Sequence, residues 1–151
     1  MFTSILVAID DSECAQRALA IAIGMALAHR SKLTIVTVVD PIEASAAAMD
    51  PYNTVQPFLE ALTQNAHQLI DESTAKAKAA GASADGLVLD GPPVETIVGL
   101  ARREHDDLVV IGSHGRKGLS RLIIGSVAEG VTREVSCPTL IVHDSVGVSQ
   151  A

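Results

Sequence analysis

A glycine-rich stretch in the last third of the chain carries the residue types best suited to chemistry. Gly112-Ser113-His114-Gly115 is followed by nine residues and then by Gly125-Ser126, and Arg116, Lys117 and Arg121 lie between the two groups. Glycines let a ligand approach the backbone closely, and successive backbone N–H groups in such a turn bind anions. Three cations stand here although the formal net charge of the chain is −7. The stretch therefore predicts a site for a small anion.

Neither common phosphate-binding motif fits this stretch. A P-loop requires G-x-x-x-x-G-K-[ST], but the sixth position counted from Gly112 is Lys117, and counted from Gly115 it is Ser120. The dinucleotide fingerprint G-x-G-x-x-G also fails, and the stretch follows the fourth predicted strand rather than the first. The chain is thus predicted to be neither a P-loop ATPase nor a typical dinucleotide-binding protein.

A helix is expected to begin at Gly125-Ser126, and its start strengthens the prediction of an anion site. The first N–H groups of a helix have no partner within it, and the helix dipole is positive at that end. The Ser126 hydroxyl is suited either to donate to a phosphate oxygen or to cap the helix. The alternatives are that the glycines only turn the chain and that the cations and His114 face solvent.

The apolar pattern predicts strands that alternate with helices. Continuous apolar runs predict strands over residues 4–9, 32–39, 85–90, 107–112 and 139–144. Apolar residues three and four apart predict a helix after each of the first four strands, with Ser12 as an N-cap and Gly81 as a helix end. The last helix is expected to turn Ala128, Val131, Thr132 and Val135 inward. Asp40–Asn53 contains two Asp-Pro steps and is expected to be a loop with at most a short helical piece.

This alternation predicts an α/β fold in a single domain, with an open parallel five-stranded sheet and helices on both faces. The length of 151 residues suits one domain, and 48% hydrophobic but only 2% aromatic residues predict an aliphatic core. In such folds ligands bind beyond the carboxyl ends of the strands, where the winding reverses. Asp10, after the first strand, and the glycine stretch, after the fourth, are both expected there.

Composition and charge argue against several classes of function. The acidic balance argues against nonspecific nucleic-acid binding, which needs a basic face. No apolar run reaches the length of a membrane span, and the N-terminus lacks the pattern of a signal peptide, so a cytoplasmic location is expected. Cys14 and Cys137 are expected to be free thiols. No spacing of histidines or acids predicts a zinc site or a catalytic triad, and no catalytic residue is assigned.

The spaced motif G-x-x-G-x9-G-[ST], from Gly112 to Ser126, resembles the nucleotide-binding motif of the ATP-binding branch of the universal stress protein family. The segments "ILVAIDDSECAQRALAIAIGMA", "LTIVTVVD" and "CPTLIVHD" also resemble the opening and closing elements of that family. The resemblance extends over nearly the whole chain, although Asp40–Gln56 carries no family signal. It implies one domain over residues 1–144 and a short flexible tail over residues 145–151.

The resemblance implies the strand order 3-2-1-4-5 and an ATP site, with Mg²⁺ as a possible companion, between strands one and four. Asp10, with Ile9 before it, would lie against the nucleoside, the Val38 backbone would contact adenine, and Ile111 would line the base pocket. The ribose and phosphates would lie against Gly112, Gly115, Gly125 and Ser126, with Val127 beside them. Apart from the resemblance, Arg116 is expected to supply positive potential near the phosphates, and His114 is a further candidate for a phosphate contact. This chain departs from the family at Ala8, where many members have proline, and at Ala128, where some ATP-binding members have a hydroxyl residue.

Three functions stay open at this point: a regulatory protein that binds ATP, a slow ATP hydrolase that uses the same pocket, and a stress protein that acts through dimer surfaces without nucleotide. The absence of a P-loop lysine and of an evident water-activating residue favours slow or absent turnover. The strand Thr139–His143 is expected at the sheet edge. Pairing with a second copy would cover it and form a homodimer. The alternative is that the tail covers this edge.

Overall fold

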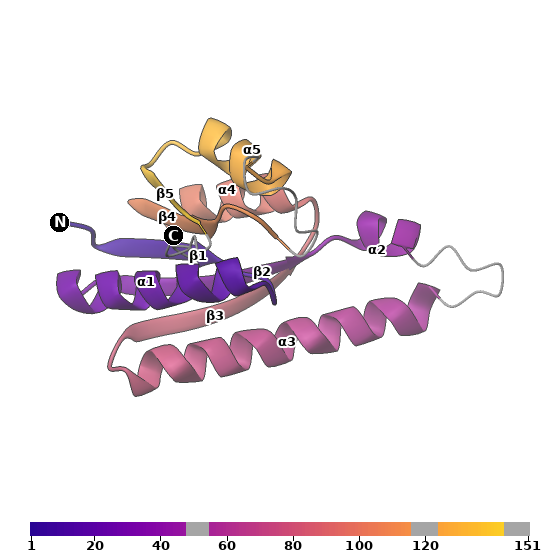
Figure 1. Ribbon diagram of the computed structural model, residues 1–151, viewed down its shortest axis with the longest axis horizontal. Helices are drawn as coiled ribbons and strands as arrows, with labels where there is room; N and C mark the ends of the chain where they lie inside the picture. The colour runs from indigo at the N-terminus through magenta and orange to yellow at the C-terminus, as the bar shows by residue number, and fades with distance from the viewer. Residues whose placement is uncertain (48–54, 116–123, 144–151) are drawn as a thin grey trace, which may run out of the picture.

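Five parallel strands form one sheet in the order β3-β2-β1-β4-β5, which confirms the predicted fold class and strand order (Figure 1). The computed structural model describes residues 1–47, 55–115 and 124–143. The strands are β1 (Ser4–Ala8), β2 (Lys32–Val39), β3 (Ser83–Asp90), β4 (Leu108–Gly112) and β5 (Thr139–Val142). The predicted tail over residues 145–151 lies outside the described residues.

The helices cover both faces of the sheet. They are α1 (Glu13–His29), α2 (Pro41–Ala47), α3 (Val55–Ala79), α4 (Pro93–Arg103) and α5 (Ser126–Glu134). α1 and α3 lie on one face, and α4 and α5 lie on the other (Figure 1). α2 and the beginning of α3 extend past the carboxyl end of the sheet, so they stand beside the edge at which a ligand is expected.

The central strand β1 has side chains in the cores on both faces of the sheet. Ile5 and Val7 pack with α1 and α3, while Leu6 and Ala8 pack with α4 and α5. Ile5, Leu6 and Val7 are each 0% exposed. A strand that is buried on both faces has no polar side to keep, so its sequence is continuously apolar. The aliphatic core predicted from composition is therefore formed on both sides of the sheet.

The predicted helix ends are confirmed where the structure describes them. The Ser12 hydroxyl accepts a hydrogen bond from the Ala15 N–H at 3.1 Å and caps α1. Gly81 follows the end of α3 with φ of +94°, a left-handed conformation that favours glycine. Pro93 is the first residue of α4, where its missing N–H costs nothing.

Several local predictions need correction. β3 starts at Ser83 rather than at residue 85, β4 starts at Leu108 rather than at residue 107, and β5 ends at Val142, so His143 is not part of the strand. Thr132 was expected to face inward, but it is exposed, because its hydroxyl donates to the Ala128 carbonyl oxygen at 2.7 Å and stays at the helix surface. The first strand ends at Ala8 rather than Ile9, whose N–H still donates to the Val36 carbonyl at 2.9 Å. The short helical piece expected after Asp40 is α2. No helix in the described parts of the chain is long and apolar enough to cross a membrane.

Candidate functional site

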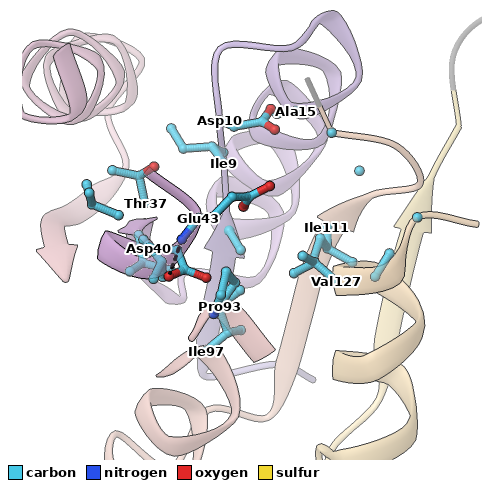
Figure 2. A pocket seen from close by; sticks show the side chains of 18 of the residues that line it. Ile9, Asp10, Ala15, Thr37, Asp40, Glu43, Pro93, Ile97, Ile111 and Val127 are labelled. Carbon is cyan, nitrogen blue, oxygen red and sulfur yellow. Dashed lines mark hydrogen bonds between the residues drawn. The ribbon is translucent and has the colours of Figure 1, made fainter. Parts of the chain in front are cut away.

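A cavity of about 430 Å³ opens at the carboxyl ends of β1, β2 and β4 (Figure 2). It lies where the strand order reverses between β1 and β4, the position at which open α/β sheets bind ligands. Its volume falls within the range of small-molecule sites. The structure brings ten of the predicted site residues to this cavity: Ile9, Asp10, Val38, Ile111, Gly112, His114, Gly115, Gly125, Ser126 and Val127. The eleventh, Arg116, lies outside the described residues, as do Lys117 and Arg121.

Asp10 is held in a fixed orientation at the cavity. Its Oδ1 accepts hydrogen bonds from the Ser12 N–H, at 3.0 Å, and from the Ser12 hydroxyl. Because Ser12 also caps α1, the carboxylate is tied to the start of that helix. Its other oxygen is directed toward Gly115: a Cβ atom added to Gly115 would lie 2.9 Å from Asp10 Oδ2. Only a residue without a side chain leaves the approach between them open.

The N-terminus of α5 forms the opposite side of the cavity. Gly125 is its N-cap residue, and a glycine has no side chain with which to cap the helix. Gly125, Ser126, Val127 and Ala128 all line the cavity. The first turn of a helix presents N–H groups without helical partners, together with the positive end of the dipole. This side of the cavity is therefore suited to bind an anion.

The two ends of the glycine stretch are tied together and to the sheet. The Gly125 N–H donates to the Ser113 carbonyl at 2.7 Å, and the Ser113 N–H donates to the Val142 carbonyl at the same distance. The Ser113 hydroxyl shares a hydrogen bond of 2.8 Å with Nδ1 of the half-buried His114. Ser113 is 0% exposed. It anchors the stretch, a role that the sequence motif, in which it is a variable position, does not indicate.

Gly112 has a packing reason to be glycine. A Cβ atom there would lie 3.1 Å from Cys14 Sγ and 3.2 Å from the Ala15 nitrogen, so α1 is able to start close against β4. The buried Cys14 thiol donates to the Val142 carbonyl at 2.9 Å, which joins α1 to β5. Cys14 and Cys137 are free thiols, as expected. Gly112 thus lines the cavity and also fixes the helix whose cap holds Asp10.

The end of β2 offers backbone groups toward the cavity. The Val36 carbonyl accepts from Ile9, so the backbone groups of Val36 point toward β1. Residues two apart in a strand direct these groups to the same side, which places those of Val38 on the β1 side as well. The paired register of β1 and β2 ends at Ala8 and Val36. Val38 therefore directs its N–H and C=O beyond the end of β1, where a planar ring is able to meet them.

Comparison with known proteins agrees with this geometry. The chain matches the model of the universal stress protein family over residues 1–143. It belongs to this family. A universal stress protein of Thermus aquaticus, from the QAH/OAS sulfhydrylase 3′ region, is 33% identical over 145 residues, which are 95% of this chain and 100% of the relative. Universal stress protein YxiE of Bacillus subtilis is 28% identical over 148 residues, with coverage of 95% and 100%.

Solved structures give the same result. Protein MJ0577, the subject of a structure-based assignment of biochemical function, is 26% identical with a TM-score of 0.82, and the match covers 95% of this chain and 97% of that one. A universal stress protein solved in complex with cAMP is 29% identical with a TM-score of 0.71, and the match covers 95% and 99%. The relatives of this universal stress protein therefore include a nucleotide-binding member.

Part of the cavity in this universal stress protein was not predicted. Thr37, Asp40, Glu43, Ala44, Phe58, Leu62, Ala66, Pro93 and Ile97 also line it. Seven of them come from α2, α3 and α4. Figure 2 shows Glu43 of α2 and Pro93 and Ile97 of α4 at the cavity. A signal for α2 was present: Asp40-Pro41-Ile42-Glu43 has the D-x-x-E pattern of a helix start, with proline in the first position. Asp40 Oδ1 accepts the N–H groups of Ile42, at 2.9 Å, and Glu43, at 3.2 Å.

Proposed function

We propose that this universal stress protein binds ATP, or a related adenine nucleotide, in the cavity between β1 and β4 and acts as a regulatory protein. The observation that carries the proposal is the N-terminus of α5, whose N-cap residue is a glycine and which lines the same cavity as Gly115 and the carboxylate of Asp10. A phosphate chain matches the helix terminus and the glycines. The relative solved with cAMP supports an adenine nucleotide as the ligand class.

In the proposed complex the parts of the nucleotide contact different residues. The phosphates lie against Gly115, Gly125 and Ser126, with Arg116 as a further candidate, and Gly112 and His114 lie nearby. The ribose lies near Asp10. The base lies among Ile9, Ile111 and Val127, with its edge toward the Val38 backbone; these four residues line the cavity together.

We propose that Mg²⁺ enters this site together with the phosphates. Among the described residues no three His, Cys, Asp or Glu side chains are grouped to hold a metal ion. A cation here would therefore take most of its ligands from phosphate oxygens and water, as Mg²⁺ commonly does, with Asp10 as the candidate carboxylate.

Calorimetric titration with ATP, with and without Mg²⁺, tests the proposal. We expect saturable heat and an upward thermal shift, because a ligand that binds only the folded state stabilises it. The absence of both at millimolar ATP would overturn the proposal. Phosphate release is expected to be slower than about 1 per second, the lower limit of working kinases. Faster release that is lost in Gly125→Val would favour the hydrolase instead.

We further propose that β5 forms the contact of a homodimer. β5 is an edge strand, and Leu140 and Ile141 on it are only partly buried. The carbonyls of Pro138 and Val142 accept from Val109 and Ser113, so the alternate residues, including Ile141, direct their backbone groups to the open edge. Such an edge pairs readily with a second copy of itself.

Sedimentation at micromolar concentration tests the dimer. Ile141→Pro removes an N–H at the open edge but none from the ladder with β4, so it is expected to shift a dimer toward monomer. Ile141→Val keeps the N–H and is expected to stay dimeric. A wild-type monomer would refute this contact.

A further inference from the structure

Thr37 is a polar residue of the cavity that has no part in the proposed nucleotide complex. It lies near the end of β2 and lines the cavity, where Figure 2 shows its side chain. The residue is only 4% exposed, and no hydrogen bond joins its hydroxyl to any other residue that the structure describes. The hydroxyls of Thr34 and Thr74 also lack a partner in the described part of the chain, but they are sealed in the core. The hydroxyl of Thr37 opens on the cavity instead.

The direction of the Thr37 side chain follows from the register of β2. Thr37 pairs with Val88 of β3, whose side chain packs in the core on the α1 and α3 face of the sheet. Ile35, two residues earlier on β2, belongs to the same core and is 0% exposed. Residues two apart in a strand share a face, so Thr37 takes a position that the strand otherwise fills with aliphatic side chains. Because valine has the same branched shape without a polar atom, packing alone gives no reason for a hydroxyl here.

The surroundings of the Thr37 hydroxyl suit an uncharged part of a ligand. Ile9, with Leu62 and Ala66 of α3, lines the cavity, and α3 packs on the same face of the sheet as Thr37. The helix α5, whose first turn suits phosphates, packs on the opposite face. A hydroxyl carries no charge and is able to donate one hydrogen bond and accept others. The group that meets Thr37 is therefore expected to be a neutral polar group at the other end of the nucleotide from the phosphates.

We infer that Thr37 binds the base of the nucleotide: its hydroxyl forms a hydrogen bond with the edge of the base, beside the backbone groups of Val38. The inference rests on the proposed nucleotide binding and adds a side chain to a base contact that otherwise consists of backbone and apolar groups. Val38 follows Thr37 directly, so a base whose edge reaches the Val38 backbone also comes close to the hydroxyl. The hydroxyl donates to a ring nitrogen or accepts from an amino group. Either bond gives it the partner that the described part of the chain does not supply.

The test measures the dissociation constants of ATP and AMP, which share the base, for the wild type and three variants. Thr37→Val removes the hydroxyl and is expected to weaken both nucleotides by the same factor, about three- to tenfold, which corresponds to one neutral hydrogen bond. Thr37→Ser keeps the hydroxyl and is expected to bind both nucleotides within about twofold of the wild type. The melting temperature of nucleotide-free Thr37→Val is not expected to fall, because no hydrogen bond between described residues is lost and valine favours strands.

The matched control is Thr34→Val. Thr34 is a threonine on the same strand, 2% exposed, and its hydroxyl has no partner among the described residues. It does not line the cavity. This variant therefore loses the same group from the same strand outside the site, and it is expected to bind both nucleotides as the wild type does.

The possible results separate this inference from the proposed function. If the wild type binds neither nucleotide, the proposed function is overturned and the inference falls with it. If the wild type binds them and Thr37→Val binds ATP equally well, only the inference is overturned. An equal loss of affinity in Thr37→Ser or Thr34→Val would assign the effect to packing rather than to the hydroxyl, and a loss for ATP without one for AMP would place the hydroxyl at the phosphates. Either result would also overturn the inference.

Discussion

The two ends of the sheet both carry aspartates at strand boundaries, yet they are organised for opposite purposes. At the amino end Asp107 precedes β4, and its carboxylate accepts hydrogen bonds from the Thr3 N–H at 2.8 Å, the Thr3 hydroxyl at 2.9 Å and the Ser4 N–H at 3.2 Å. At the carboxyl end Asp10 follows β1, and the bonds that its Oδ1 accepts come from Ser12, two residues further on.

The difference lies in what each carboxylate connects. Asp107 joins segments about one hundred residues apart in the sequence and ties the start of β1 to the start of β4. Asp10 is fastened locally and directs its second oxygen toward Gly115, across the mouth of a cavity. The first arrangement stabilises the fold, and the second holds a polar group at the cavity in which we propose that a nucleotide binds. Strand-end aspartates thus acquire their role from the elements that meet them.

The largest expected effect comes from filling the gap at the carboxyl end. Gly115→Val places side-chain atoms where the added Cβ alone would lie 2.9 Å from Asp10 Oδ2. We expect ATP affinity to fall by about 100-fold or more, equivalent to about 3 kcal/mol, while the melting temperature changes little because Gly115 is exposed. Calorimetric titration and thermal unfolding measure the two quantities.

The matched control for this variant is Gly99→Val. Gly99 is exposed on α4, and an added Cβ there meets nothing within 4 Å. It is expected to bind ATP as the wild type does. If Gly115→Val also binds ATP with wild-type affinity, the glycine stretch is not the phosphate site.

The sequence was sufficient for the parts of this molecule that depend on local patterns. The continuous apolar strands and the caps at Ser12 and Gly81 follow from neighbouring residues, and so does the start of α5 at Ser126. The strand order came from the family resemblance. The predicted site residues that the structure describes all line one cavity, because they follow strands whose carboxyl ends meet there.

The parts that the sequence left open depend on how distant elements pack. Glu43 and Phe58 line the cavity only because α2 and α3 extend past the sheet, and no short-range pattern encodes that placement. Gly112 is required by the approach of α1, whose Cys14 lies about one hundred positions away in the chain. Thr132 faces outward because its hydroxyl bonds to its own helix, which spacing alone does not indicate.

A smaller effect, at the amino end, should change stability without changing binding. Asp107→Ala removes the acceptor of three hydrogen bonds, and we expect the free energy of unfolding to fall by about 1 to 2 kcal/mol. Although burial raises the pKa of Asp107, the hydrogen bonds from Thr3 and Ser4 lower it more, so the pKa lies below its usual value. ATP affinity is expected to stay unchanged, because the cavity lies at the other end of the sheet.

The pH dependence of Asp107→Ala has a defined sign. A carboxyl whose pKa is lower in the folded state contributes stability that is present above its unfolded pKa and is lost as the pH falls through its folded pKa. The difference in the free energy of unfolding between Asp107→Ala and the wild type should therefore be constant near neutral pH and shrink below about pH 4. Urea denaturation at several pH values measures it, and a difference that grows toward low pH would contradict the assignment.

The smallest change in the free energy of unfolding is expected for a substitution of the neighbouring Asp106. This substitution should raise stability at neutral pH, whereas Asp107→Ala should lower it. Asp106 is 7% exposed, and its Oδ1 accepts the Ser4 hydroxyl at 2.6 Å, but its Oδ2 has no partner among the described residues. Burial raises the pKa of Asp106, and the hydrogen bond from Ser4 opposes that change only in part. The ionised carboxylate is therefore disfavoured in the folded state, and wild-type stability should decrease as the pH rises from about 4 through the folded pKa.

Asp106→Asn keeps an acceptor for Ser4 and removes the charge, so at pH 7 it should raise the free energy of unfolding by up to about 1 kcal/mol. The gain should vanish near pH 4, where the wild type is also protonated. Paired urea titrations at pH 7 and pH 4.5 measure the change in the free energy of unfolding, and a change that is the same at both pH values would contradict a contribution from the charge of Asp106.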